Sequence, residues 1–277
     1  MSPETSFPVD TTWVFKQFIF EDVLRELDDH FQSLNIDYMP IKGAYLICSG
    51  LAKLIKSRSM NDIDILVCER DFDIAISYFK SIRNVTIANG SWPVNKKIWP
   101  FEVTFYYQFE GRTINFELHK LINLHQRFIL PPEQLFARGR REGYRILPCA
   151  EDALVICICH RFSHVGNFYS DALFIDAAFL ANTSISWEKF WEIAKSTGIA
   201  GFVYYVLKKI EKKGMILPVR IPKKTNNFTY ASILLTIFGN RDLIALPPIL
   251  RRLLIELPFC LNPLGLLINK CKIFLCR

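Results

Sequence analysis

Helical and extended apolar patterns alternate along the first half of this chain and give way to helical patterns alone after Pro131-Pro132. Apolar residues that recur every three to four positions predict an amphipathic helix, whereas short alternating or β-branched runs predict a strand. On this basis we expect helices at 12–34, 44–55 and 71–82, and strands at 37–41, 63–67, 99–109 and 112–121. Glu110-Gly111 separates the last two strands and is typical of a tight hairpin. The first half is therefore predicted to be α+β.

The second half is predicted to be helical, because further segments there show helical spacing. These segments are 151–165, 169–181, 187–195 and 199–212. Ser186 stands directly before the third of them, where a serine can cap the first turn. We therefore predict two domains, an α/β domain at 1–130 and a helical domain at 131–277 that ends in a basic, apolar tail.

Charge is distributed unevenly along the chain. The formal net charge is +7, but residues 201–277 hold 13 Lys and Arg against 3 Asp and Glu, which gives this segment +10. A basic, apolar tail suits contact with an anionic partner such as nucleic acid or a membrane surface. The plainer interpretation is a helical cap with solvated lysines. No transmembrane segment is expected, since charged residues and prolines interrupt the most apolar stretch, 243–268.

The cysteines and the N-terminus bear on the cellular compartment. None of the eight cysteines forms a CxxC pair and five lie inside apolar runs, which favours buried free thiols in a reducing environment. Residues 1–15 contain acidic residues and lack the basic and apolar regions of a secretory signal. We therefore expect a cytoplasmic protein.

Two carboxylates mark the start of the predicted strand at 63–67. Asp62 and Asp64 are two residues apart, and side chains at this spacing project from the same face of a strand. Adjacent carboxylates repel each other unless a cation lies between them. Their hard oxygen atoms suit Mg²⁺ or Mn²⁺, and two such ions roughly 4 Å apart can clamp both sides of a phosphoryl displacement. The alternative interpretation is a pair of solvated loop aspartates.

A strand-to-helix turn lies upstream of these aspartates at Lys42-Gly43. Gly43 lets the backbone come close to a ligand, and the free N–H groups of the following helix favour an anion. Lys42 adds a positive charge suited to phosphate. The alternative interpretation is that these two residues form an ordinary turn between a strand and a helix, with no ligand.

A third polar element lies in the predicted strand at 112–121. Glu117 and His119 share one face of this strand, while Phe116 and Leu118 face the core. The segment between Asp64 and Glu117 has room for one helix and a hairpin, which would place the two strands side by side. Glu117 can then complete a three-carboxylate metal site, and His119 can orient an acceptor or a metal-bound water.

Together these elements resemble the nucleotidyltransferase superfamily, whose minimal pattern is a glycine turn, an hDhDh strand and a third acidic strand residue. More narrowly, the chain resembles the uncharacterised nucleotidyltransferase family often found in bacteria. That family reads K-G, then R-x-M/S-x-D-I-D-[IL]-L-V, then [DE]-L-H, matched here by Lys42-Gly43, Arg58 through Val67, and Glu117-Leu118-His119. The resemblance spans about 14–215 and continues through Pro148, Glu151-Asp152, His160, Asp176 and Trp187-Glu188.

This resemblance implies a nucleotidyltransferase-like mixed β-sheet flanked by helices, followed by an all-helical C-terminal domain. It also implies Mg²⁺- or Mn²⁺-dependent transfer of a nucleoside monophosphate from an NTP to a hydroxyl acceptor, which can be a small molecule, a peptide, a protein or an RNA end. The residues implied to hold metal are Asp62, Asp64 and Glu117, and those implied to contact the nucleotide are Lys42, Gly43, Arg58 and His119. Lys42-Gly43 stands where the superfamily has Gly-Ser, so the serine that grips the phosphates has no counterpart.

Other functions share parts of this pattern. A metal-dependent glycosyltransferase also uses a DxD motif, but there the apolar strand normally precedes the motif, whereas here it starts inside the motif and continues to Val67. A catalytically lapsed nucleotide- or partner-binding module would keep the same fold without turnover. His160 and His164 have the spacing of a helical zinc pair, but Arg161 replaces the glutamate of HExxH.

Overall fold

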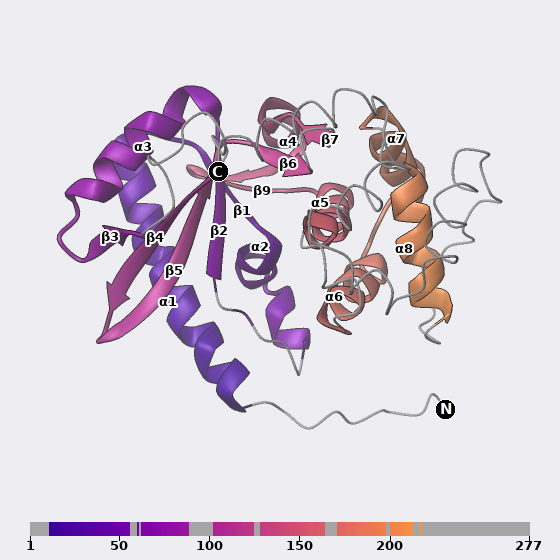
Figure 1. The fold of residues 1–277 in the computed structure, drawn as a ribbon, viewed down its shortest axis with the longest axis horizontal. Coiled ribbons are helices and arrows are strands. Elements are labelled where there is room, and N and C mark those ends of the chain that lie inside the picture. The colour runs from indigo at the N-terminus through magenta and orange to yellow at the C-terminus, as the bar shows by residue number, and fades with distance from the viewer. Residues whose placement is uncertain are drawn as a thin grey trace, which may run out of the picture. The chain divides into compact units, whose positions relative to one another are not determined.

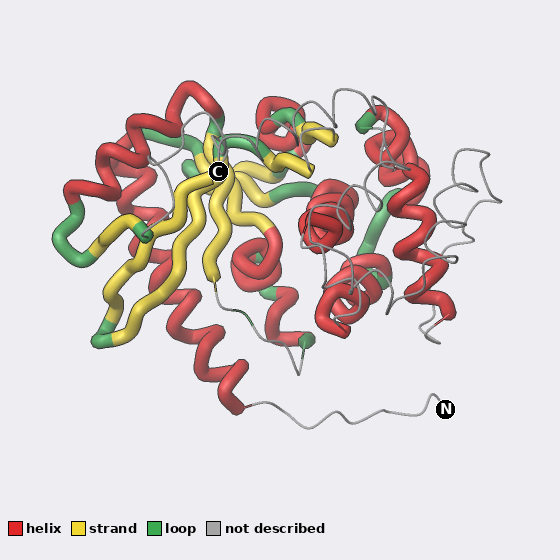
Figure 2. Tube along the Cα trace, viewed as in Figure 1, coloured by secondary structure: helices red, strands yellow, loops and turns green. Residues whose placement is uncertain are grey.

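The computed structural model of the protein describes residues 11–55, 60, 62–88, 102–124, 128–163, 171–197, 200–212 and 217. The chain divides into two compact units, the first drawn from Met1–Ile122 and Pro131–Cys149 and the second from Asn123–Leu130 and Ala150–Arg277. The first unit contains the strands of the larger sheet together with several helices, and the second consists mainly of helices (Figure 2). In the part of the chain that the structure describes, no helix has the length and apolar character needed to cross a membrane.

A seven-stranded mixed sheet forms the centre of the first unit (Figure 1). Its strands are β1 (Tyr38–Ile41), β2 (Asp62–Val67), β3 (Val85–Ile87), β4 (Glu102–Phe109), β5 (Arg112–His119), β8 (Arg140–Glu142) and β9 (Arg145–Leu147). They are ordered β3-β4-β5-β2-β1-β9-β8. β2 pairs with β5 and β1 pairs with β9 in parallel, whereas the other neighbouring strands of the sheet pair antiparallel. This arrangement confirms the expected mixed sheet and fits a nucleotidyltransferase-like fold.

The helices of the first unit are α1 (Thr11–Leu34), α2 (Lys42–Cys48), the short 3₁₀ helix η1 (Leu51–Leu54), α3 (Glu69–Ser81) and α4 (Pro132–Arg138). The single helix predicted at 44–55 is instead two pieces. Gly50 separates them with a φ of 73°, the left-handed conformation in which helices commonly end. The periodicity of the apolar residues does not detect this break, because it continues through both pieces.

Aromatic side chains fill the core between one face of the sheet and helices α1 and α3. The ring centroid of Phe79, in α3, lies 5.5 Å from Phe31 in α1, 5.8 Å from Phe105 in β4 and 5.0 Å from Phe116 in β5. Phe31 also stacks on Tyr38 of β1 at 4.5 Å. Because side chains alternate between the two faces of a strand, the residues next to these aromatics must point to the opposite face.

The hairpin predicted at Glu110-Gly111 joins β4 to β5. Both residues have positive φ, 46° at Glu110 and 73° at Gly111, as a two-residue hairpin turn of type I′ requires. The turn holds the long antiparallel pairing in which Glu102 lies opposite His119. Residues 99–101, which the sequence places in the same strand as β4, lie outside the described residues.

The second unit contains α5 (Ala150–Ser163), α6 (Asp171–Ala181), α7 (Trp187–Ser196) and α8 (Ala200–Lys212). A separate two-stranded sheet pairs β6 (Ile122–Leu124) with β7 (Phe128–Leu130). Ser186 caps α7 as predicted, since its side chain accepts a hydrogen bond from the backbone N–H of Lys189. Its own backbone N–H donates to Glu151 at 2.7 Å, which ties the start of α7 to α5.

Residues 131–149 contribute to the sheet of the first unit rather than to a run of helices. β9 adds to the sheet beside β1, and β8 pairs with β9 at the sheet edge. These two strands are three residues long, too short to show a clear periodicity. The domain boundary between residues 130 and 131 stays a prediction. An all-helical segment 131–277 is not supported, because β8 and β9 lie within it. The basic tail from 218 lies outside the described residues.

We expect truncation of Phe79 to destabilise the protein strongly. Phe79→Ala removes a fully buried ring that contacts α1, β4 and β5, and such changes cost about 3–5 kcal/mol. Ile74, on the same helix, is 54% exposed, so Ile74→Ala is expected to change stability by no more than about 0.5 kcal/mol. Urea unfolding followed by circular dichroism measures both, and similar losses for the two variants would contradict this core.

Candidate active site

Polar side chains from three adjacent strands alternate with the core residues of the sheet. In the parallel pairing of β2 with β5, Asp64 lies opposite Glu117. In the antiparallel pairing of β4 with β5, Glu102 lies opposite His119. Since Glu117 and His119 are two residues apart on β5, all four side chains share the face that the aromatic core does not occupy.

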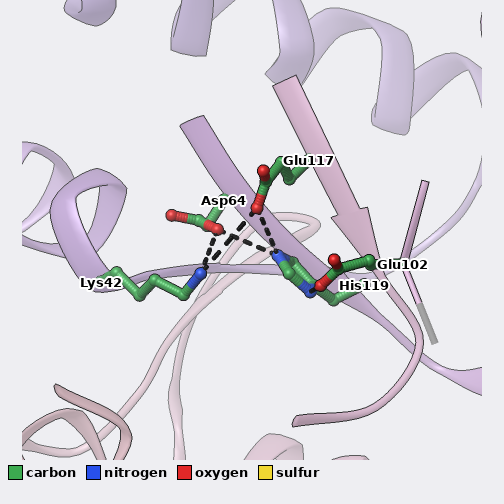
Figure 3. A network of polar contacts seen from close by, with 5 residues as sticks. All are labelled: Lys42, Asp64, Glu102, Glu117 and His119. Carbon is green, nitrogen blue, oxygen red and sulfur yellow. Dashed lines mark hydrogen bonds and ion pairs between the residues drawn. The ribbon is translucent and has the colours of Figure 1, made fainter. Parts of the chain in front are cut away.

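Asp64 is the centre of this group (Figure 3). Its Oδ1 atom lies 2.5 Å from Nζ of Lys42 and 3.0 Å from Nε2 of His119. The Asp64 side chain is only 2% exposed. A carboxylate this deeply buried needs opposite charge and hydrogen-bond donors, and Lys42 and His119 supply both.

Two further carboxylates surround the same cations. Oε2 of Glu117 lies 3.6 Å from Nε2 of His119 and 4.0 Å from Nζ of Lys42. Oε2 of Glu102 lies 3.4 Å from Nδ1, the other ring nitrogen of His119. The imidazole is therefore held between Glu102 on one side and the pair Asp64 and Glu117 on the other (Figure 3).

Lys42 reaches this group from the first residue of α2. The pairing of β1 with β2 sets Ile41 opposite Asp64, which brings the next residue, Lys42, beside the carboxylate. Lys42 has a φ of 55°, a left-handed conformation that is unfavourable for a residue with a Cβ and costs on the order of 1–3 kcal/mol. The ion pair with Asp64 helps offset that cost and fixes the direction of the side chain.

The carboxylates keep both cations charged. Burial alone would lower the pKa of Lys42, but the charges of Asp64 and Glu117 outweigh it and hold this pKa above its ordinary value. Burial also disfavours the charged form of His119, yet its hydrogen bonds with Asp64 and Glu117 raise its pKa to about 9. At neutral pH both ring nitrogens of His119 therefore carry protons, and Nε2 donates to Asp64.

The donor atoms suit a divalent cation. One ligand atom each from Asp64, Glu117 and His119 lies within 4.8 Å of the other two. With Glu102 and Asp62 nearby, four carboxylates face the two positive charges of Lys42 and His119. The formal excess of negative charge favours a bound cation, and carboxylate oxygens are the ligands that Mg²⁺ and Mn²⁺ prefer.

The structure brings only part of the predicted site together. Asp62 is half-buried at the start of β2, opposite Asn115, and acts on Lys42 through its charge, but it is not among the three residues whose ligand atoms converge. Gly43 is buried in α2. Arg58 lies outside the described residues. The metal and nucleotide roles of all the predicted residues stay predictions.

Glu102 is the member of the group that sequence reasoning missed. It stands at the first residue of β4, where a lone acid is usually an exposed strand end. The available signal was alternation, since Glu102 and Thr104 alternate with the buried Val103 and Phe105. The side chains of His160 and His164, the alternative zinc pair, lie outside the part that the structure describes.

A protein-family model described as "Uncharacterised nucleotidyltransferase" matches residues 13–212. The chain belongs to this family. No curated protein and no solved structure shows significant similarity to it. Membership of the nucleotidyltransferase family supports nucleotidyl transfer in general and a nucleotide substrate. The start of β2 at Asp62, with its apolar residues after the DxD motif, agrees with this family rather than with a glycosyltransferase.

We expect His119 of this nucleotidyltransferase family member to titrate near pH 9 when no metal ion is added. The pKa of His119 is higher in the folded protein than in the unfolded chain, where it is about 6.5. The protonated ring therefore contributes its full stabilisation of the fold below about pH 6.5. This stabilisation is lost as the pH rises through about 9. NMR of the histidine ring protons measures the pKa directly, and Asp64→Asn should lower it by removing the negative charge.

His30 provides an internal control for this titration. Nδ1 of His30 forms a hydrogen bond with the hydroxyl of Tyr78 at 2.9 Å. Burial lowers the pKa of His30 below its ordinary value despite nearby acidic residues. The two histidines should therefore titrate on opposite sides of pH 6.5. A His119 that titrates with His30, or an unchanged pKa in the Asp64→Asn variant, would contradict the described network.

Proposed function

We propose that this protein transfers a nucleoside monophosphate from an NTP to a hydroxyl acceptor with release of pyrophosphate. The proposal is carried by one observation, the pairing of β2 with β5 that sets the carboxylates of Asp64 and Glu117 side by side next to Lys42. Membership of a nucleotidyltransferase family supports the same reaction class.

In this proposal Asp62, Asp64 and Glu117 bind Mg²⁺ or Mn²⁺. A bound divalent ion would neutralise charge on the phosphates and favour in-line attack of the acceptor oxygen on the α-phosphorus. Glu117 is more exposed than Asp64, 24% against 2%, so it is the carboxylate better placed to accept the proton of an incoming hydroxyl. Asp64, buried and doubly hydrogen-bonded, fixes the geometry of the site.

Lys42 provides positive charge for the phosphates. Its ammonium group lies beside the carboxylates of Asp64 and Glu117. A phosphate held to these carboxylates through a metal ion would therefore lie next to Lys42. We propose that Lys42 contacts the β- and γ-phosphates together with the backbone of Gly43, and that Arg58 and His119 also line the nucleotide site. Positioning and charge neutralisation then supply most of the rate.

The acceptor is a hydroxyl group of a small molecule, a peptide, a protein or an RNA end. A cytoplasmic location and an anionic partner for the basic segment 201–277 belong to the same proposal, on the strength of the sequence alone. Incubation of α-labelled NTPs with cell extract and the full-length protein tests the reaction, because a labelled product identifies the acceptor.

Loss of any of the three carboxylates is expected to stop turnover. Asp62→Ala, Asp64→Ala and Glu117→Ala should each lower pyrophosphate release at least about 100-fold, since even outer partners of metal ligands are worth about 10–100-fold. Asp73→Ala, which removes an exposed acid on α3, is the control and should retain full activity. Turnover that survives in one of the three variants would remove that residue from the mechanism.

Lys42→Met tests the role of the ammonium group. The substitution keeps an unbranched side chain and should weaken NTP binding about tenfold or more, because a hydrogen bond to a charged group contributes about 1.5–3 kcal/mol. Metal binding without nucleotide should become tighter, since the cation bound to Asp64 is gone. Calorimetric titration measures both affinities. Lys53→Met, at an exposed lysine of η1, is the control, and parallel changes in both affinities would argue against this role.

The second candidate function is a binding module that has lost turnover. The 2.5 Å pair between Lys42 and Asp64 favours it, because the lysine neutralises the buried carboxylate without a metal ion. Such a module would be stabilised thermally by Mg²⁺ and NTP but would release no pyrophosphate and label no acceptor.

A further inference from the structure

His119 differs from the other polar residues of the site because it offers nitrogen rather than oxygen. Its Nε2 atom lies 3.0 Å from Oδ1 of Asp64 and 3.6 Å from Oε2 of Glu117. Neighbouring donors in an octahedral site with bonds of about 2.1 Å are about 3 Å apart. The spacing of these three atoms therefore suits three ligands of one ion.

The surroundings of the ring fix its orientation. The His119 side chain is only 7% exposed, and its second nitrogen, Nδ1, lies 3.4 Å from Oε2 of Glu102. Histidines that bind metal usually donate their other ring N–H to a carboxylate or carbonyl, which fixes the tautomer and the direction of the free nitrogen. Glu102 is placed to accept that hydrogen bond and to keep Nε2 directed at Asp64 and Glu117.

We propose that Nε2 of His119 is a direct metal ligand beside Asp64 and Glu117, and that Glu102 is the residue that positions its ring. This inference rests on the proposed function, because it concerns the same metal site. Mg²⁺ strongly prefers oxygen ligands, whereas imidazole nitrogen suits transition-metal ions. A mixed nitrogen and oxygen site should therefore bind Mn²⁺ in preference to Mg²⁺.

The described contacts favour this role over a direct phosphate contact by His119. Both ring nitrogens already face carboxylates, and the ring is almost fully buried. Nε2 must release its proton to bind a metal ion, and the bound ion then replaces the positive charge that the ring loses beside Asp64 and Glu117.

Pulsed electron paramagnetic resonance of the Mn²⁺-loaded, full-length protein tests the ligand directly. An imidazole bound to Mn²⁺ produces ¹⁴N modulation of the spin echo, which carboxylates and water do not. We expect this signal in the unmodified protein and its loss in His119→Gln, whose amide can offer an oxygen instead. The inference would be overturned if Mn²⁺ bound to the unmodified protein gave no ¹⁴N modulation, or if the modulation persisted in His119→Gln. The first of these measurements uses the unmodified protein alone, so it does not depend on whether the variant folds.

Metal affinities provide the second measurement. His119→Gln should weaken Mn²⁺ binding at least about tenfold and Mg²⁺ binding less, so that the preference for Mn²⁺ shrinks. Glu102→Ala should weaken Mn²⁺ binding about tenfold, whereas Glu102→Gln should retain most of it, because the amide oxygen still accepts from Nδ1. Equal effects of the two Glu102 variants would overturn its positioning role.

Two further variants distinguish failure of this inference from failure of the proposed function. Glu69→Ala removes an exposed carboxylate that pairs with Lys120, next to His119, and should leave Mn²⁺ affinity unchanged. If Asp64→Ala abolishes Mn²⁺ binding while His119→Gln does not alter it, the proposed function survives and the nitrogen ligand is overturned. If the unmodified protein binds neither Mn²⁺ nor Mg²⁺ in the presence of NTP, both are overturned.

Discussion

The register between β2 and β5 is the constraint on which the site depends. Asp64 lies directly opposite Glu117 in this parallel pair. Because successive side chains of a strand point to opposite faces, a slip of one residue would place an apolar core residue across from Asp64. The buried faces of both strands prevent that slip, since it would turn Ile63 and Ile65 out of the core. The aromatic packing beneath the sheet thus fixes the position of the acidic groups above it.

Two cations stabilise the buried carboxylate at the centre of the group. Asp64 is almost completely buried, and an unpaired carboxylate there would be costly. Lys42 and His119 donate to the same oxygen atom of Asp64, one from a helix start and the other from a neighbouring strand. The raised pKa values of both cations have this physical origin, since proton loss from either would leave buried negative charge uncompensated.

The sequence predicted the parts of the site that obey a local rule. The alternation around Asp64 and around Glu117 places each acid on the polar face of its strand, and the intervening segment is long enough for a helix and a hairpin. Local rules do not specify which oxygen Lys42 contacts, because that depends on the pairing of β1 with β2. The contact of Glu102 with His119 likewise depends on the register of a hairpin. The short strands β8 and β9 were not predicted, because three residues are too few to show the alternation of apolar and polar side chains that identifies a strand.

Oδ1 of Asp64 is the atom at which the metal-binding and phosphate-binding parts of the proposed site meet. It accepts from Lys42, which we assign to the phosphates, and from His119, which we assign to the metal. A cation that binds Asp64 competes with the lysine ammonium, and a phosphate near Lys42 draws that ammonium away from Asp64. Each ligand therefore removes an obstacle to the other, and thermodynamic linkage makes the effect reciprocal.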